Sequence, residues 1–139
     1  MKYGSLILEK KEYVYLKRIL NISGYVQDNE RHKSLIKLLE ELESANIVDE
    51  DQMPDDIVRF NSTVTVIFNN GVKKVVQVVI PSERDFKNHK ISVLTPLGSA
   101  LIGYSENDSV IWSFPTGNEE ILISEVEQEK ELDKTNFSI

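Results

Sequence analysis

The sequence predicts an α+β protein, with a short antiparallel helical hairpin (coiled coil) followed by a small, mostly antiparallel β domain that contains one short helix. Two observations support this prediction. Up to about residue 46 the apolar residues recur with helical spacing, and from residue 61 they alternate with a period of two. The acidic residues and Pro54 between these halves favour a break in the chain. The expected parts are a helical hairpin (1–50), a linker (51–60), a β domain (61–128) and a flexible tail (129–139).

The first predicted helix covers residues 9–21. Its residues Tyr13, Leu16 and Leu20 are spaced so that they share one face, and charged residues stand between them. Gly24 is a candidate C-cap. The second helix is predicted from about Asp28, an N-cap residue type, to about residue 46. Its apolar stripe consists of Leu35, Leu38, Leu39 and Leu42. We expect each helix to bury its stripe against the other, because both helices are amphipathic and joined by a short connection.

The second half of the chain reads as strands and turns. Val64, Val66 and Phe68 alternate with Thr63, Thr65 and Ile67, and residues 69–71 (Asn-Asn-Gly) supply a hairpin turn. The returning strand is predicted to end at Pro81, and a polar loop with a helical turn follows over residues 82–89. A second strand pair is expected over residues 109–114 and 119–126.

Residues 91–103 form the most informative stretch, ISVLTPLGSALIG. A short β-branched strand is followed by Thr95, whose hydroxyl can cap the free backbone donors of a helix. Pro96 fits the first helical position, where its missing N–H costs nothing. Gly103 fits the left-handed residue that ends a helix. The pattern predicts a strand, a turn and a short apolar helix, and it contains no catalytic group.

The composition of the chain limits the kinds of partner and site that are expected. The net charge of −7 and the lack of any long basic cluster disfavour direct binding to nucleic acid, so a protein partner is expected. The chain has no cysteine and no long apolar run, which predicts a cytoplasmic protein without disulfides, thiolate metal sites or membrane spans. The acidic residues 49–56 lack the spacing of a calcium loop. No catalytic residue, metal site or cofactor is predicted, and the chain is not expected to be an enzyme.

Four stretches resemble known proteins: MPDDIVRFNSTV (53–64), ISVLTPLGSALIG (91–103), NDSVIW (107–112) and FPTG (114–117). In this order and spacing they are similar to the Gre transcription factor superfamily, and within it to the short-hairpin branch of Rnk-type regulators of nucleoside diphosphate kinase. The resemblance implies an N-terminal coiled-coil hairpin and a C-terminal domain of FKBP-like fold. The helical half matches mainly in pattern and length.

The resemblance also implies a partner and a binding site. Gre factors dock on RNA polymerase beside its secondary channel, through the loop that Leu94, Thr95, Pro96 and Leu97 resemble; we call residues 94–97 the predicted docking loop. The hairpin of a Gre factor enters the channel, where acidic residues at its tip hold a Mg²⁺ ion. That ion stimulates the polymerase to cleave backtracked RNA, because a second metal helps to activate the attacking water.

The predicted hairpin tip differs from that of cleavage factors. It offers Asp28 and Glu30, but not an Asp-x-x-Glu pair followed by an aromatic residue. Asp28 fits an N-cap, and Glu30 fits a first helical turn, where the helix dipole favours acids. Tyr25 either contacts a partner or folds over the hairpin end. A helix of roughly a dozen residues also reaches only about 18 Å.

The prediction is therefore a monomeric regulator that binds RNA polymerase without strong transcript-cleavage activity. Two alternatives stay open. One is a cleavage factor that uses Asp28 and Glu30 on Mg²⁺, and the other is a small isomerase-like or ligand-binding domain.

Overall fold

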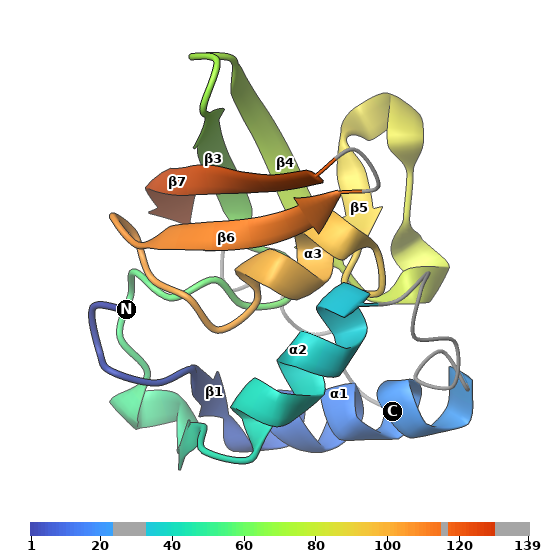
Figure 1. Cartoon of the computed structure of the whole chain (residues 1–139). Coiled ribbons are helices and arrows are strands. Elements are labelled where there is room, and N and C mark those ends of the chain that lie inside the picture. The colour runs from blue at the N-terminus through green and yellow to red at the C-terminus, as the bar shows by residue number, and fades with distance from the viewer. Residues whose placement is uncertain (24–32, 115–116, 130–139) are drawn as a thin grey trace.

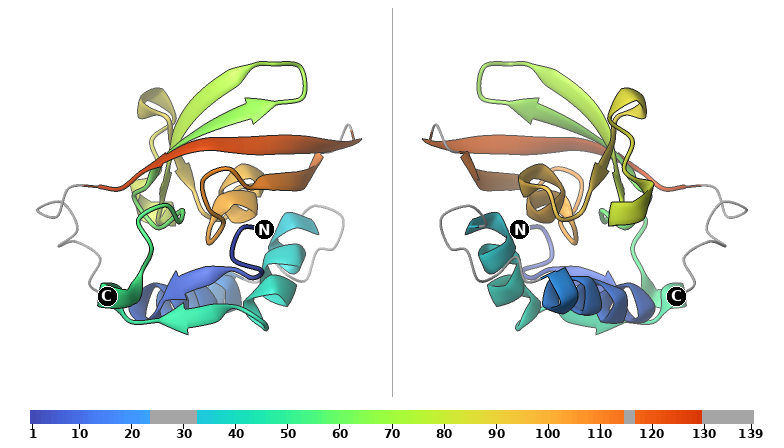
Figure 2. Two further views of the ribbon diagram at one scale, coloured as in Figure 1. Left: turned by 90° about the vertical axis from the view of Figure 1, so that its left-hand side faces the viewer. Right: turned by 90° about the vertical axis from the view of Figure 1, so that its right-hand side faces the viewer.

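The computed structural model describes residues 1–23, 33–114 and 117–129 (Figure 1). These residues form three α-helices, a two-stranded sheet and a five-stranded sheet, which confirms the α+β class. Among them, no helix combines the length and apolarity needed to cross a bilayer. Figure 2 shows the layers: the larger sheet lies on one side, α1 and α2 lie on the other, and α3 lies between the sheet and α2.

The N-terminal layer contains two helices and a small parallel sheet. Strand β1 (Ile7–Glu9) leads directly into α1 (Lys10–Ser23), and α2 (Lys33–Leu42) is followed by β2 (Asn46–Val48). Strands β1 and β2 pair in parallel, so they join the two ends of the helical layer. The sequence did not predict these strands, because three residues are too few to display a period of two. Gly24 and Asp28, the predicted caps, lie outside the described residues.

The five strands of the larger sheet lie in the order β5-β4-β3-β7-β6. The hairpin β3 (Thr63–Phe68) and β4 (Lys73–Val79) confirms the predicted strands, as do β6 (Ser109–Phe114) and β7 (Gly117–Glu127). Strand β5 (Lys90–Ser92) pairs with β4 in parallel at the edge of the sheet. The connection between them contains two short 3₁₀ turns, Pro81–Glu83 and Phe86–Asn88, where a polar loop with a helical turn was predicted.

One hydrophobic core joins the helices to the sheet. Leu16 and Leu20 of α1 and Leu38 of α2 are buried in the same cluster as Val64 and Ile123 of the sheet. Leucines of both helical stripes therefore join the core of the β domain, and α2 packs against α3 and β6, whereas the expected packing of the two helices against each other stays a prediction. The end of the predicted linker, residues 57–60, is also buried.

A buried ion-pair cluster holds α1 against the segment that enters the sheet. Arg59 Nε donates to Oε1 of Glu12 at 3.0 Å, and its terminal nitrogens donate to the two carboxylate oxygens of Glu50 at 2.8 and 2.7 Å. Glu9 accepts from the backbone N–H groups of Lys11 and Glu12 at the start of the helix. Burial raises the pKa of Glu12 to about 7; the positive charge of Arg59 opposes this rise, and the nearby Glu9 and Glu50 add to it.

Because the pKa of Glu12 is raised, we expect the free energy of unfolding to fall as the pH rises from about 4.5 to about 7. Its pKa in the folded protein is about 7, against an ordinary value of 4.5, so the folded state binds the proton more tightly. The stabilisation is complete below pH 4.5 and is lost as the pH rises through the folded pKa, a change of up to roughly 3 kcal/mol. Urea unfolding between pH 4.5 and 8 measures it.

The variant Glu12→Gln is the matched control, because its amide oxygen can still accept from Arg59 but does not titrate. We expect it to have a flatter pH profile than the wild type and to be the more stable protein at pH 8. Identical profiles for the two proteins would show that Glu12 is not the titrating group.

Candidate functional site

The predicted docking loop connects β5 to α3 (Pro96–Leu101), and hydrogen bonds hold it at both ends. The Thr95 hydroxyl accepts from the backbone N–H of Gly98 at 3.1 Å and donates to the carbonyl oxygen of Ser92 at 2.7 Å. The Ser92 hydroxyl in turn accepts from the N–H of Leu94 at 3.0 Å. Thr95 is thus the N-cap and Pro96 the first residue of the helix, as the sequence predicted.

The loop exposes apolar surface on this rigid support. Pro96 is exposed, whereas Leu94, Thr95 and Leu97 are half-buried. The inner parts of Leu94 and Leu97 pack against the hydrophobic core. The structure therefore brings the four predicted residues together into one small surface. A proline ring and two leucine edges offer apolar surface that suits contact with another protein. They offer no group for acid–base or nucleophilic chemistry.

Gly98 allows α3 to lie directly against the end of β5. A Cβ atom at this position would lie 2.3 Å from the carbonyl oxygen of Ser92 and 2.9 Å from Cα of Val93. Val93 is itself fixed, because its N–H donates to the carbonyl of Val79 at 2.9 Å. At the other end of the helix, Gly103 has φ +83° and confirms the predicted left-handed terminator.

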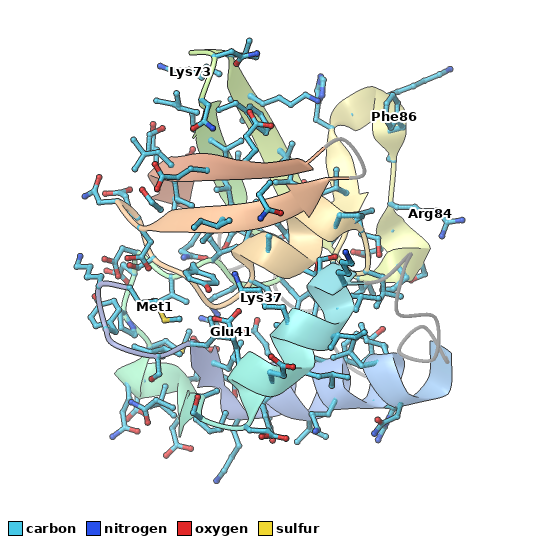
Figure 3. All side chains as sticks on the ribbon, viewed as in Figure 1. Met1, Lys37, Glu41, Lys73, Arg84 and Phe86 are labelled. Atoms are coloured by element: carbon cyan, nitrogen blue, oxygen red, sulfur yellow. The ribbon has the colours of Figure 1, made fainter. Side chains whose placement is uncertain are left out.

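Lys37 and Glu41, both on α2 (Figure 3), join this helix to β6 and to the segment that follows α3. The Tyr104 hydroxyl donates to Oε2 of Glu41 at 2.5 Å, and Lys37 Nζ donates to the carbonyl oxygen of Ile111 at 3.2 Å. Burial raises the pKa of Tyr104, and the hydrogen bond to Glu41 raises it further. Because α3 follows directly from the predicted docking loop, these contacts also help to set where α2 lies relative to that loop.

A cavity of about 280 Å³ lies between α2, α3 and β6. Lys33, Lys37 and Glu41 line it from α2, and Ser99 and Ala100 line it from α3. Its volume is just under the range typical of small-molecule sites. Among the described residues, no group of three or more histidines, cysteines or acids is placed to hold a metal ion. The predicted tip residues Tyr25, Asp28 and Glu30 lie outside the described residues.

Two features of the structure were not predicted from the sequence. One is Arg59, which lies in the predicted linker (51–60) and is only 8% exposed. The other is Phe86, which is 94% exposed in the connection between β4 and β5. A signal existed for Phe86, since it is an aromatic residue alone in a polar segment. No local signal identified Arg59, because its partner Glu12 is distant in the sequence.

The chain is similar to proteins that act in transcription. Residues 53–128 match the family described as transcription elongation factor, GreA/GreB, C-term. Transcription elongation factor GreA of Rhodopseudomonas palustris (strain TIE-1) is 39% identical over 92 residues, which cover 66% of this chain and 58% of that protein. The regulator of nucleoside diphosphate kinase of Escherichia coli (strain K12) is 35% identical over 78 residues, which cover 55% of this chain and 57% of that protein.

The fold has a solved counterpart. The prokaryotic transcription elongation factor GreA/GreB from Nitrosomonas europaea has a TM-score of 0.69 and 27% identity, and the match covers 89% of this chain and 98% of that one. The chain spans 58% of the length of the R. palustris GreA and 57% of the length of the E. coli regulator. Because the family match extends over more than half of the 139 residues and includes α3 with its preceding loop, the chain belongs to the GreA/GreB family, and Rnk-type regulators are among its relatives.

Proposed function

We propose that the chain regulates transcription by binding RNA polymerase beside its secondary channel through the predicted docking loop. The observation that carries this proposal is the loop itself, in which a Gre-family sequence leaves Pro96 exposed while Thr95 is bonded on both sides. A surface that is already ordered loses little conformational entropy when a partner binds. The family supplies the kind of partner, and the loop supplies a preformed contact.

The same proposal includes weak or absent transcript-cleavage activity. The 14 residues of α1 make a helix roughly 21 Å long. The other helix, α2, lies along the β domain, where Lys37 donates to the carbonyl of Ile111 on β6 and Glu41 accepts from Tyr104. The acids Asp28 and Glu30 also lack the spacing of cleavage factors. The proposed role is to occupy the channel entrance and to compete with longer factors.

A competition assay with core RNA polymerase tests the docking loop. We expect the fluorescently labelled chain to bind saturably and to be displaced by a full-length GreA. The double variant Thr95→Asp with Pro96→Ala should bind about tenfold more weakly or worse, because it places a charge within the contact. Aspartate is a good N-cap residue and alanine a good helix former, so α3 should still form.

Asn70→Asp is the matched control, since it adds one negative charge at an exposed turn of the β3–β4 hairpin. Wild-type affinity in the docking-loop variant would reject the assigned loop, and failure of the wild type to bind would reject the function. Adding the factor and Mg²⁺ to a backtracked complex should release no more RNA than polymerase alone. Extra cleavage that Asp28→Asn with Glu30→Gln abolishes would instead establish the cleavage factor.

A further inference from the structure

The connection between β4 and β5 places a phenyl ring in water. Phe86 is 94% exposed, the largest exposed fraction among the large apolar side chains of the described residues. Figure 3 shows Phe86 beyond the edge of the sheet, on the side of β5. Apolar surface left in water is unfavourable, so burial of this ring against a partner would contribute to binding.

The ring is not carried by a loose loop. The N–H of Asp85 donates to the carbonyl of Lys90 at 3.0 Å, and the N–H of Lys90 donates to the carbonyl of Asp85 at 2.9 Å. Within this closed turn, Asn88 Nδ2 donates to the Asp85 carboxylate at 2.6 Å, and His89 takes the left-handed conformation. The turn therefore holds the backbone of Phe86 in one position, and an aromatic side chain has few rotatable bonds to order when a partner binds.

The charges beside the ring indicate what it contacts. Arg84 and Lys87 flank Phe86 and are both exposed. The acid between them, Asp85, is bonded to Asn88 within the turn. Residues 82–90 contain three bases (Arg84, Lys87 and Lys90) and two acids (Glu83 and Asp85), so this connection has a net charge of +1 in a protein whose net charge is −7. This combination fits an apolar pocket bordered by carboxylates on a partner protein.

The ring and the docking loop lie at the two ends of the same strand. Strand β5 has three residues and so spans about 10 Å. A standard interface buries about 800 Å² on each partner, and a patch of that area can include both ends of β5. We infer that Phe86 is a second contact of the polymerase-docking surface, inserted into an apolar pocket whose border carries carboxylates. The inference rests on the proposed function, because it takes the same partner.

The polymerase competition assay tests this contact with Phe86→Ala. We expect affinity to fall about tenfold to a hundredfold, the range found when a central aromatic residue of an interface is truncated. The urea midpoint should not change, since the ring is almost fully exposed. Val72→Ala is the matched control, because Val72 is 51% exposed and lies in the turn between β3 and β4, beside the Asn70 control position. It should bind like the wild type.

A second experiment tests the two cations beside the ring, Arg84 and Lys87. Arg84→Ala with Lys87→Ala should weaken binding at low salt and reduce its salt dependence, whereas Lys73→Ala with Lys74→Ala, an exposed pair on β4, should have no effect.

The outcomes separate this inference from the proposed function. If the wild type does not bind polymerase, both are rejected. If the docking-loop variant is weakened but Phe86→Ala is not, only the Phe86 contact is rejected. A wild type that sediments as a dimer, with Phe86→Ala sedimenting as a monomer, would assign the ring to a second copy of the chain and overturn the partner named here.

Discussion

Replacing Arg59 by alanine is expected to lower the free energy of unfolding by about 3 kcal/mol at pH 7.5. The side chains of Arg59 and Glu12 are each only 9% exposed, so the substitution leaves a carboxylate without its cation inside the protein. Breaking a buried ion pair in this way costs about 3–5 kcal/mol. We expect the lower end, because Glu12 can take up a proton and Glu50, with a side chain that is 63% exposed, can return to water.

Urea unfolding of a double-mutant cycle measures this effect. Adding Glu12→Gln to Arg59→Ala should recover a large part of the lost stability, because the unpaired charge is then removed. Lys10→Ala is the control, since Lys10 and Asp49 form a more exposed pair at 3.7 Å whose loss should be hard to detect. Strict additivity of the Arg59 and Glu12 substitutions would contradict the buried pair.

The local features of the fold could be predicted because adjacent residues decide them. Thr95, Pro96 and Gly103 mark the start and end of α3 through their own hydrogen-bonding capacity and backbone geometry, and all three occupy the predicted places. The turn between β3 and β4 could be predicted in the same way from Asn-Asn-Gly, and Gly71 has φ +85° there. The four motifs also led to the correct family, because they fall within the matched residues 53–128.

The long-range features could not be predicted in the same way. Glu12 stands at a charged position of an amphipathic helix, and only the fold brings it to Arg59, 47 residues later. The pairing of β1 with β2 and of β5 with β4 likewise depends on segments that carry no periodic signal of their own. The docking role of residues 94–97 stays a prediction, since contact with a partner is a property of two molecules.

Gly98→Ala is the second substitution with a large expected effect, and it acts on the docking loop itself. The added Cβ would lie 2.3 Å from the Ser92 carbonyl oxygen, closer than real Cβ contacts, so α3 must move away from β5. Overpacking costs about 1–3 kcal/mol, and the upper end applies here because the obstacle is backbone, which yields less than a side chain. Alanine regains about 1 kcal/mol of helix propensity, which leaves a net loss of roughly 2 kcal/mol.

The displacement also predicts a change in binding that stability alone would not cause. When α3 moves, the Thr95 cap moves with it, so polymerase affinity should fall at a temperature where the variant is still folded. Ser99→Ala is the control on the same helix: it removes one hydrogen bond, from the Ser99 hydroxyl to the carbonyl of Pro96 at 3.0 Å, and adds no atom near β5.

A Gly98→Ala protein with an unchanged melting temperature would mean that the helix and the strand are not in the close contact described. A destabilised variant that binds polymerase as tightly as the wild type would separate this contact from docking, and the surface formed by residues 94–97 would then have to be reassigned.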